Sequence, residues 1–380
     1  MKKLSILTSI ILFLLIVVNL AFFIKSHLAI YTYPINPAFL EKLYGQSQYV
    51  RMDPISILPD ETVYAYASWR YMHGENPAMF NADQPPLGKY FIGLSEIYFN
   101  NERLTGPVFN VLSLVALFVL SCLVLKDYFW SIILVTFFSF EKLFTVQMLY
   151  APLLDNIQLF FILLSFIFYI LSLKKPRALL VAMLMLGFVM SVKFWVTGVV
   201  IYVIWLIHKI FAKNIKGLLR FLVTSPLIIF SMLLVYLPSF LQGDSLRRFF
   251  GVQKYIFEFH RAKIHMDPVA VWDLLFFNRW HVPWEGVIKQ SVDWQWTWPL
   301  ITAFSLITAA IVCRQKISKG LTSEIGVVVI WLVAYFFLLL VGAVVPRYLL
   351  PVMPAMYILS FWLIKEFLAR IHRSWYNSKT

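Results

Sequence analysis

The chain has 380 residues, of which 61% are hydrophobic, 18% are aromatic and only 14% are charged. Soluble domains average about 25% charged residues, so this composition excludes a soluble protein and predicts a polytopic membrane protein. The formal net charge is +14, which in a membrane protein reports orientation and not nucleic-acid binding. Cys122 lies inside an apolar run and Cys313 at a basic run end, so neither a disulfide nor a cysteine metal site is expected.

The N-terminal apolar run, 4–24, follows Lys2 and Lys3. It is longer than the hydrophobic part of a signal peptide and lacks a small-residue cleavage site. The run is therefore predicted to be an uncleaved signal anchor.

Further apolar runs predict an all-α helical bundle, because a bilayer core needs about 20 apolar residues per helix. The stretch 178–208 is too long for one helix and carries Lys193 in its middle, so we divide it there. We expect about 10–11 transmembrane helices in one domain over 1–380, with outer juxtamembrane helices. The predicted spans are 4–24, 107–125, 129–147, 153–173, 178–191, 194–208, 221–240, 297–313, 325–345 and 348–364.

Basic clusters then sort to the side of the N-terminus, which the positive-inside rule makes cytoplasmic. They are Lys126, Lys174, Lys175, Arg177, Lys209, Lys213, Lys216, Arg220, Arg314, Lys316, Lys319, Lys365, Arg370 and Arg373. Both termini are predicted to be cytoplasmic. The segment 87–99 carries Lys89 and Glu96 and is predicted to be a juxtamembrane helix, since a span there would invert every later loop.

Two long loops, 25–106 and 241–296, are therefore predicted to face the exterior, and the second is too short for a sizeable extra domain. Several ionisable residues converge at that surface, and such groups near hydrocarbon are functional candidates. They are Asp60, Glu61, Asp83, Lys89, Arg103, Asp155, Lys193 and Arg347.

The cationic residues of this set suit the phosphate of a lipid carrier. The carboxylates suit proton transfer. A partly desolvated carboxylate could take a proton from an alcohol, while the leaving phosphate needs charge stabilisation more than protonation. The cations within reach of such a phosphate are Lys89, Arg103, Lys193 and Arg347.

Structural roles compete with this interpretation. Asp60 could cap a helix over 61–73, and Asp155 could cap the fourth span. Lys89 or Arg103 could reach lipid head groups, and Arg347 could be an interfacial anchor. Lys193 is harder to explain in this way, because it interrupts an apolar run.

Motifs in the first outer loop carry a family resemblance. Asp60-Glu61-Thr62-Val63-Tyr64, followed by Asp83-Gln84-Pro85-Pro86-Leu87-Gly88-Lys89, resembles the first outer loop of the protein O-mannosyltransferases. The later elements that are similar to this family, in the same order, are Leu153-Leu154-Asp155, Ser191-Val192-Lys193-Phe194-Trp195-Val196-Thr197-Gly198, Trp296-Thr297-Trp298-Pro299 and Arg347-Tyr348-Leu349-Leu350-Pro351.

The resemblance implies a compact prokaryotic relative within the GT-C superfamily. It implies inverting transfer of a sugar, typically mannose, from a polyprenyl- or dolichyl-phosphate carrier. Asp60 then matches the catalytic base and Glu61 its neighbour at the acceptor site. Positions near the carrier phosphate or substrate are matched by Asp83, Lys89, Arg103, Asp155, Lys193, Arg347 and Trp298.

The sequence departs from the family pattern at two histidine positions. Gln84 replaces the histidine before Pro-Pro, and 287–291 lacks the histidine expected upstream of Trp296. His265 and His281 are the candidates to replace the second histidine. The second outer loop is also too short for the soluble module of the eukaryotic members.

Alternatives remain open at this point. The acceptor is expected to be a protein Ser/Thr hydroxyl or a glycan, and another sugar, such as aminoarabinose, could be transferred to a lipid or glycan. Ionisable groups at mid-membrane or internal repeats would indicate a transporter or flippase. In this sequence the charges gather at one boundary and no internal repeat is visible. A purely structural membrane subunit is the remaining alternative. No cofactor is required, although Asp60, Glu61, Asp83 and Asp155 could form an oxygen site for a divalent metal.

Overall fold

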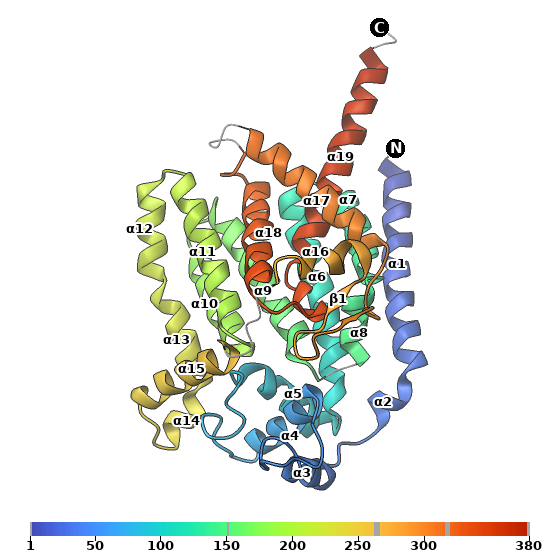
Figure 1. Cartoon of the computed structure of the whole chain (residues 1–380). Helices are drawn as coiled ribbons and strands as arrows, with labels where there is room; N and C mark the ends of the chain where they lie inside the picture. The colour runs from blue at the N-terminus through green and yellow to red at the C-terminus, as the bar shows by residue number, and fades with distance from the viewer. Residues whose placement is uncertain (1, 150–151, 262–266, 316–319, 378–380) are drawn as a thin grey trace.

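The computed structural model describes residues 2–149, 152–261, 267–315 and 320–377. Apolar helices run side by side in a bundle, and both ends of the chain lie at the same end of it (Figure 1). The bundle helices are α1 (Lys2–Ser26), α6 (Thr105–Leu125), α7 (Tyr128–Ser139), α8 (Lys142–Leu149), α9 (Leu154–Ser172), α10 (Ala178–Val192), α11 (Val196–Phe211), α12 (Ile215–Thr224), α13 (Pro226–Val235), α17 (Thr297–Arg314), α18 (Glu324–Val341) and α19 (Met353–Asn377).

All ten predicted apolar runs overlap one or more helices. Six of the described helical stretches are long and apolar enough to cross a membrane, or seven if the pair α7 and α8, bent by 54°, is one span. The other predicted spans correspond to the shorter helices α10 and α11 and to the apolar first half of α19. The all-α polytopic membrane fold is confirmed.

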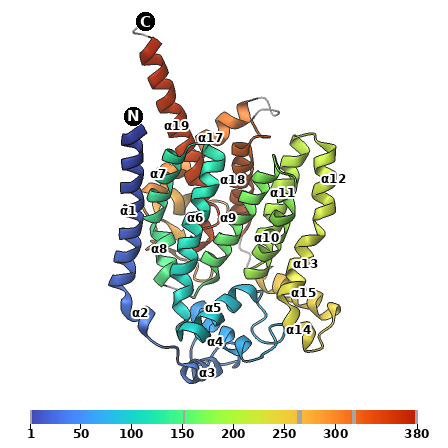
Figure 2. The same cartoon turned by 180° about the vertical axis from the view of Figure 1, so that it is seen from behind.

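A layer of short elements covers the end of the bundle opposite the termini (Figures 1 and 2). The predicted helix over 61–73 is confirmed as α4, and the predicted juxtamembrane helix is confirmed as α5. The elements of this layer are α2 (Leu28–Thr32), α3 (Pro37–Gly45), α4 (Asp60–Met72), α5 (Leu87–Phe99), η1 (Glu102–Leu104), α14 (Leu237–Leu241) and α15 (Leu246–Arg261). Four further short elements are α16 (Ala270–Phe277), β1 (Trp280–His281), β2 (Ile288–Lys289) and η2 (Pro346–Leu349), of which α16 and β1 lie nearer the middle of the bundle (Figure 1).

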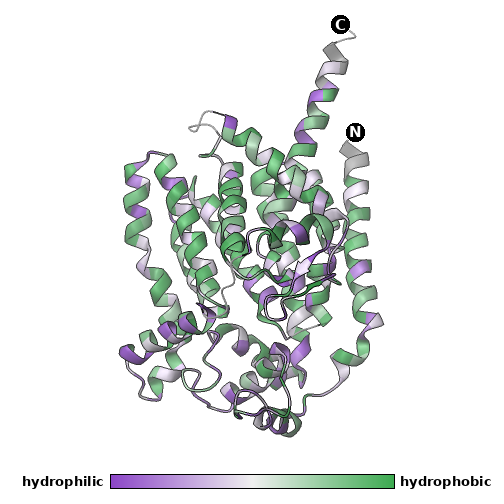
Figure 3. Cartoon of the chain, viewed as in Figure 1, coloured by the Kyte–Doolittle hydropathy of each residue, from purple (hydrophilic) through white to green (hydrophobic). Residues whose placement is uncertain are grey.

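Hydropathy separates the two parts of the molecule. Apolar residues dominate the bundle, whereas hydrophilic residues gather in the layer of short elements (Figure 3). The hairpin of β1 and β2 pairs Trp280 with Lys289 and His281 with Ile288 in antiparallel register. The burial of apolar side chains between helices, with lipid-facing ones outside, is the arrangement that a bilayer favours.

Gly88 fixes the contact between α5 and the bundle. A Cβ atom at this position would lie 2.6 Å from Cδ2 of Leu154 and 3.2 Å from Cγ1 of Val192. Glycine therefore lets α5 pack directly on the start of α9 and the end of α10 without displacing these side chains. This contact brings the Pro-Pro-Leu-Gly-Lys segment close to Asp155 and Lys193, the neighbours of Leu154 and Val192 in sequence.

Candidate active site

Four predicted site residues, far apart in sequence, meet where the bundle joins the layer of short elements. Asp60 begins α4, Asp155 lies in the first turn of α9, Lys193 separates α10 from α11, and Arg347 lies in η2. They form two ion pairs, Asp60 with Arg347 and Asp155 with Lys193. The predicted convergence of these ionisable groups is therefore observed for these four.

The Asp60–Arg347 pair joins the first outer loop to the segment before the last helix. Nη2 of Arg347 donates to Oδ2 of Asp60 at 2.6 Å. Pro59 is the residue that precedes the helix, and Asp60 is its first residue, without a capping hydrogen bond from its side chain. The alternative role of Asp60 as a helix cap is thus not observed. The negative charge at the start of α4 is still favourable, because the helix dipole is positive there.

The Lys193–Asp155 pair occupies the break between α10 and α11. Lys193 has an extended backbone (φ −141°, ψ −178°) that ends α10. Its Nζ donates to Oδ1 of Asp155 at 2.5 Å, and the two side chains are only 12% and 5% exposed. Asp155 follows Leu153 and Leu154 and makes no cap hydrogen bond. Removal of one partner from such a pair leaves a buried charge uncompensated, which is costly.

Tyr348 links the two ion pairs. Nζ of Lys193 lies 5.0 Å from the centre of its ring, and Cζ of Arg347 lies 5.8 Å from the same ring. Burial lowers the pKa of Arg347, but the nearby carboxylates of Asp155 and Asp60 outweigh it and raise the pKa above its usual value. Nε of Arg347 is buried and has no hydrogen-bond partner among the described residues. A buried donor without a partner is uncommon in folded proteins.

A cavity of about 260 Å³, which we call the Lys193 cavity, opens beside these pairs. Polar groups line one part of it and aliphatic side chains of α18 line another. The wall includes Gln84, Asp155, Lys193, His260, Arg261, Leu338, Leu339 and Tyr348. A polar end next to an apolar wall suits an amphipathic ligand with an anionic head.

His260 is a cavity residue that the sequence analysis did not select. Its Nε2 lies 3.0 Å from Nε2 of Gln84 and 3.1 Å from the carbonyl oxygen of Asp83. The ring stacks on Phe194 with centroids 4.5 Å apart. An imidazole thus lies beside Gln84, the position at which the motif lacks its histidine. The available signal was the His260-Arg261 pair at the end of an amphipathic segment, which has no motif spacing to identify it.

Neither histidine that we considered as a replacement for the missing one is found in the wall of the Lys193 cavity within the described residues. His265 lies outside the residues that the structure describes. His281 lies on β1, with Nδ1 2.7 Å from Asp267 and Nε2 2.9 Å from Asp273. Burial lowers the pKa of His281, but hydrogen bonds to these two carboxylates outweigh it and raise the pKa. This imidazole holds the hairpin against α16.

Lys89 is completely buried and does not line the Lys193 cavity. Its Nζ donates to the carbonyl oxygens of Asn81 at 2.5 Å and Gln84 at 3.2 Å, and to the hydroxyl of Tyr71 at 3.4 Å. Burial lowers its pKa to about 8, although Asp83 and Asp60 oppose this shift. These contacts give Lys89 the role of holding the loop before α5, and its ammonium does not reach the cavity.

The other two carboxylates of the predicted set lie on either side of this loop. Asp83 is buried and lines a separate cleft, described below. Glu61 is half-buried next to Asp60. Its side chain makes no hydrogen bond or ion pair with any residue in the described ranges.

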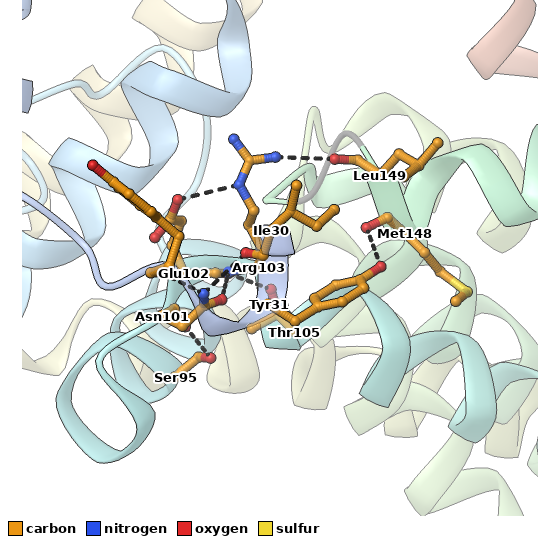
Figure 4. A network of polar contacts seen from close by, with 10 residues as sticks. Ile30, Tyr31, Ser95, Asn101, Glu102, Arg103, Thr105, Met148 and Leu149 are labelled. Carbon is orange, nitrogen blue, oxygen red and sulfur yellow. Dashed lines mark hydrogen bonds and ion pairs between the residues drawn. The ribbon is translucent and has the colours of Figure 1, made fainter. Parts of the chain in front are cut away.

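Arg103 lies in a different network, which joins η1 to the end of α8 (Figure 4). Its Nη1 donates to the carbonyl oxygen of Leu149 at 3.0 Å, and its Nε lies 3.4 Å from Glu102. Tyr31 donates to the carbonyl oxygen of Met148 at 2.9 Å in the same network. The structure therefore does not bring Arg103 together with Lys193 and Arg347.

Trp298 is also away from the ion pairs. It is fully buried at the start of α17, and its Nε1 donates to Oε1 of Glu141 at 2.7 Å. Tyr357 donates to the other oxygen of Glu141, also at 2.7 Å. Trp298 thus stabilises the bend between α7 and α8 and is not part of the cavity wall.

Metal binding has no support from the described part of the chain, in which no group of three or more His, Cys, Asp or Glu side chains could hold an ion. Of the four carboxylates considered for an oxygen site, Asp60 and Asp155 each bind a cationic side chain instead.

The described helices define a class, the polytopic α-helical membrane proteins. The solved structure of ArnT from Cupriavidus metallidurans bound to undecaprenyl phosphate is similar to this chain, with a TM-score of 0.59 and 14% sequence identity. The match covers 91% of this chain and 60% of ArnT, so the chain spans about three fifths of the length of that protein. No family model and no curated protein matches the sequence.

Proposed function

We propose that the protein is an inverting glycosyltransferase that moves a sugar from a polyprenyl-phosphate carrier to a hydroxyl acceptor. The observation that carries this proposal is Lys193, held by Asp155 in the wall of a partly apolar cavity, with a second cation, Arg347, beside it on the ring of Tyr348. A lipid phosphate requires cations at head-group depth and apolar surface for its chain. The similarity to ArnT, solved with undecaprenyl phosphate, supports this choice of carrier.

In the proposed reaction, the carrier phosphate takes Lys193 and Arg347 as its counter-ions. Arg347 then leaves Asp60, whose carboxylate becomes available to the acceptor. The acceptor oxygen attacks the anomeric carbon as its proton passes to Asp60, and the bond from that carbon to the phosphate oxygen breaks. The electron pair stays on the phosphate, which the two cations stabilise, so one base is sufficient.

We propose two combinations of transferred sugar and acceptor. The sequence motifs favour mannose, on a polyprenyl or dolichyl carrier, and a protein Ser/Thr hydroxyl as acceptor. The similarity to ArnT supports equally a second combination, in which an aminoarabinose-like sugar moves to a lipid or glycan. Glu61, next to Asp60, is then proposed to contact the acceptor.

The proposed location is a prokaryotic plasma membrane with the site facing the exterior. The bundle carries exposed Lys126 and Lys174 at the end where the termini lie, and the site lies at the opposite end. Positive charge marks the cytoplasmic side, so this placement supports cytoplasmic termini.

The test is transfer by the purified full chain in liposomes. Synthetic polyprenyl-phosphate-mannose and polyprenyl-phosphate-aminoarabinose are offered with Ser/Thr peptides and with glycans. Asp60→Asn is expected to lower the transfer rate by about 10²–10⁴-fold, the usual contribution of a general base. Asp53→Asn, an exposed aspartate in the same loop, is the matched control and should keep the wild-type rate.

Two outcomes would contradict the proposal at different levels. Wild-type transfer by Asp60→Asn would remove Asp60 from the role of base. No turnover with any lipid-phosphate sugar, together with translocation of a labelled lipid across the liposome, would instead support the flippase alternative.

A further inference from the structure

A second hollow, which we call the tyrosine cleft, lies in the layer of short elements. It has a volume of about 490 Å³ and is bounded by α3 with the turn after it, by the 78–83 segment and by α15. The side chains that define it are Tyr44, Tyr49, Asp83, Arg248 and Tyr255.

The loop before α5 separates the tyrosine cleft from the Lys193 cavity. Asp83 lines the cleft, whereas its neighbour Gln84 lines the cavity. Lys89 holds this wall from within, through the carbonyl oxygens of Asn81 and Gln84. Two binding spaces on opposite sides of one short wall are what a transferase needs for a donor and an acceptor.

Aromatic rings and one carboxylate determine the chemistry of the cleft. The rings of Tyr44 and Tyr49 stack at an interplanar angle of 12° with centroids 5.7 Å apart. Tyr255 is 50% exposed on the facing helix. Burial raises the pKa of Tyr49, and the carboxylates of Asp83 and then Asp60 raise it further.

The charge of the cleft is nearly balanced. Arg248 lies 3.3 Å from Asp244 and also contacts the sulfur of Met79, so its guanidinium is already engaged. An anionic acceptor would require a cluster of arginines, which the lining of this cleft does not supply. The lining therefore suits a ligand without net charge.

A peptide is a poorer fit than a sugar. Peptides usually add to a sheet edge or lay an apolar helix face into an apolar groove, and the lining offers neither. Tyrosine rings present an apolar face together with a polar hydroxyl, and a carboxylate accepts hydrogen bonds from hydroxyl groups. These features match the alternating apolar and hydroxyl faces of a pyranose.

We propose that the tyrosine cleft binds the acceptor and that this acceptor is a neutral glycan, whose hydroxyl reaches Asp60 past the wall at Asp83. This inference rests on the proposed glycosyl transfer. It selects a glycan hydroxyl over a protein Ser/Thr side chain within that function.

The test combines an acceptor panel with three variants of the full chain in liposomes. The acceptors are neutral alkyl oligosaccharides, Ser/Thr hexapeptides and a phosphorylated glucosamine disaccharide lipid. Tyr255→Ala should raise the acceptor KM about tenfold, because it removes a stacking ring. Tyr255→Phe keeps the ring and should stay within about threefold of the wild type. Tyr98→Ala, a 75% exposed tyrosine on α5, is the matched control.

Donor KM is measured in parallel and separates the possible failures. An increase in acceptor KM with an unchanged donor KM supports the cleft as the acceptor site. Transfer only to peptides or to the phosphorylated lipid, or an unchanged acceptor KM in Tyr255→Ala, overturns the inference and leaves the proposed transfer intact. The absence of any transfer or donor hydrolysis contradicts both.

Discussion

The two ends of the bundle use cations in opposite ways. At the end near the termini, Lys126 and Lys174 are 62% and 76% exposed and share one carboxylate, Glu324, at 3.2 and 3.6 Å. At the other end, Lys193 is 12% exposed and has its own carboxylate. Exposed pairs contribute little to stability, whereas a buried charge persists only with a specific partner. Charge at the first end is therefore loosely held, and charge at the second end is held by a specific buried partner.

The largest effect on this comparison is expected from neutralising one lysine at each end. Lys193→Gln leaves Asp155 buried without its cation, which should lower the free energy of unfolding by about 3–5 kcal/mol. Lys174→Gln should change it by less than about 1 kcal/mol. Thermal unfolding in detergent measures both variants. Equal shifts in Tm would show that the two ends do not differ.

A smaller effect on stability is expected when pH is changed, because Lys89 titrates at a different pH in the folded and unfolded chain. Its folded-state pKa of about 8 lies below the usual lysine value of 10.5, so the unfolded chain binds more protons between these two values. The wild type should therefore gain stability as pH rises from about 8 to 10, by up to about 1.4 kcal/mol per pH unit.

Lys89→Met removes this titration. The stability of the wild type relative to Lys89→Met should therefore increase with pH over the same window, measured by chemical unfolding in detergent. A difference that stays constant or falls with pH would contradict the placement of Lys89 in a fully buried site.

The smallest effect is expected at Arg103. Its hydrogen bond to the carbonyl oxygen of Leu149 ties η1 to α8, so Arg103→Gln should cost about 1 kcal/mol of stability. Donor KM should stay at the wild-type value because Arg103 does not line the Lys193 cavity. A tenfold increase in donor KM would instead restore Arg103 to the phosphate-binding set that the sequence predicted.

Sequence patterns were sufficient for the helices but only partly for the site. Apolar runs and the break at Lys193 predicted the bundle, because lipid imposes length and composition on every span. The direction in which a side chain points depends on tertiary contacts that no run length encodes. Lys89 turns inward to backbone carbonyls, and Trp298 pairs with Glu141, 157 positions away. His260 reaches the cavity from a helix without any motif.

The central claim is that Arg347 exchanges Asp60 for the phosphate of the lipid carrier. Binding of undecaprenyl phosphate to the purified protein in nanodiscs tests it most directly, with Arg347→Gln compared with Arg314→Gln, an exposed arginine at the other end of the bundle. We predict that Arg347→Gln weakens binding by about 10–100-fold, as expected for a lost charged hydrogen bond, and that Arg314→Gln leaves it unchanged. Equal affinity of Arg347→Gln and the wild type would contradict the account.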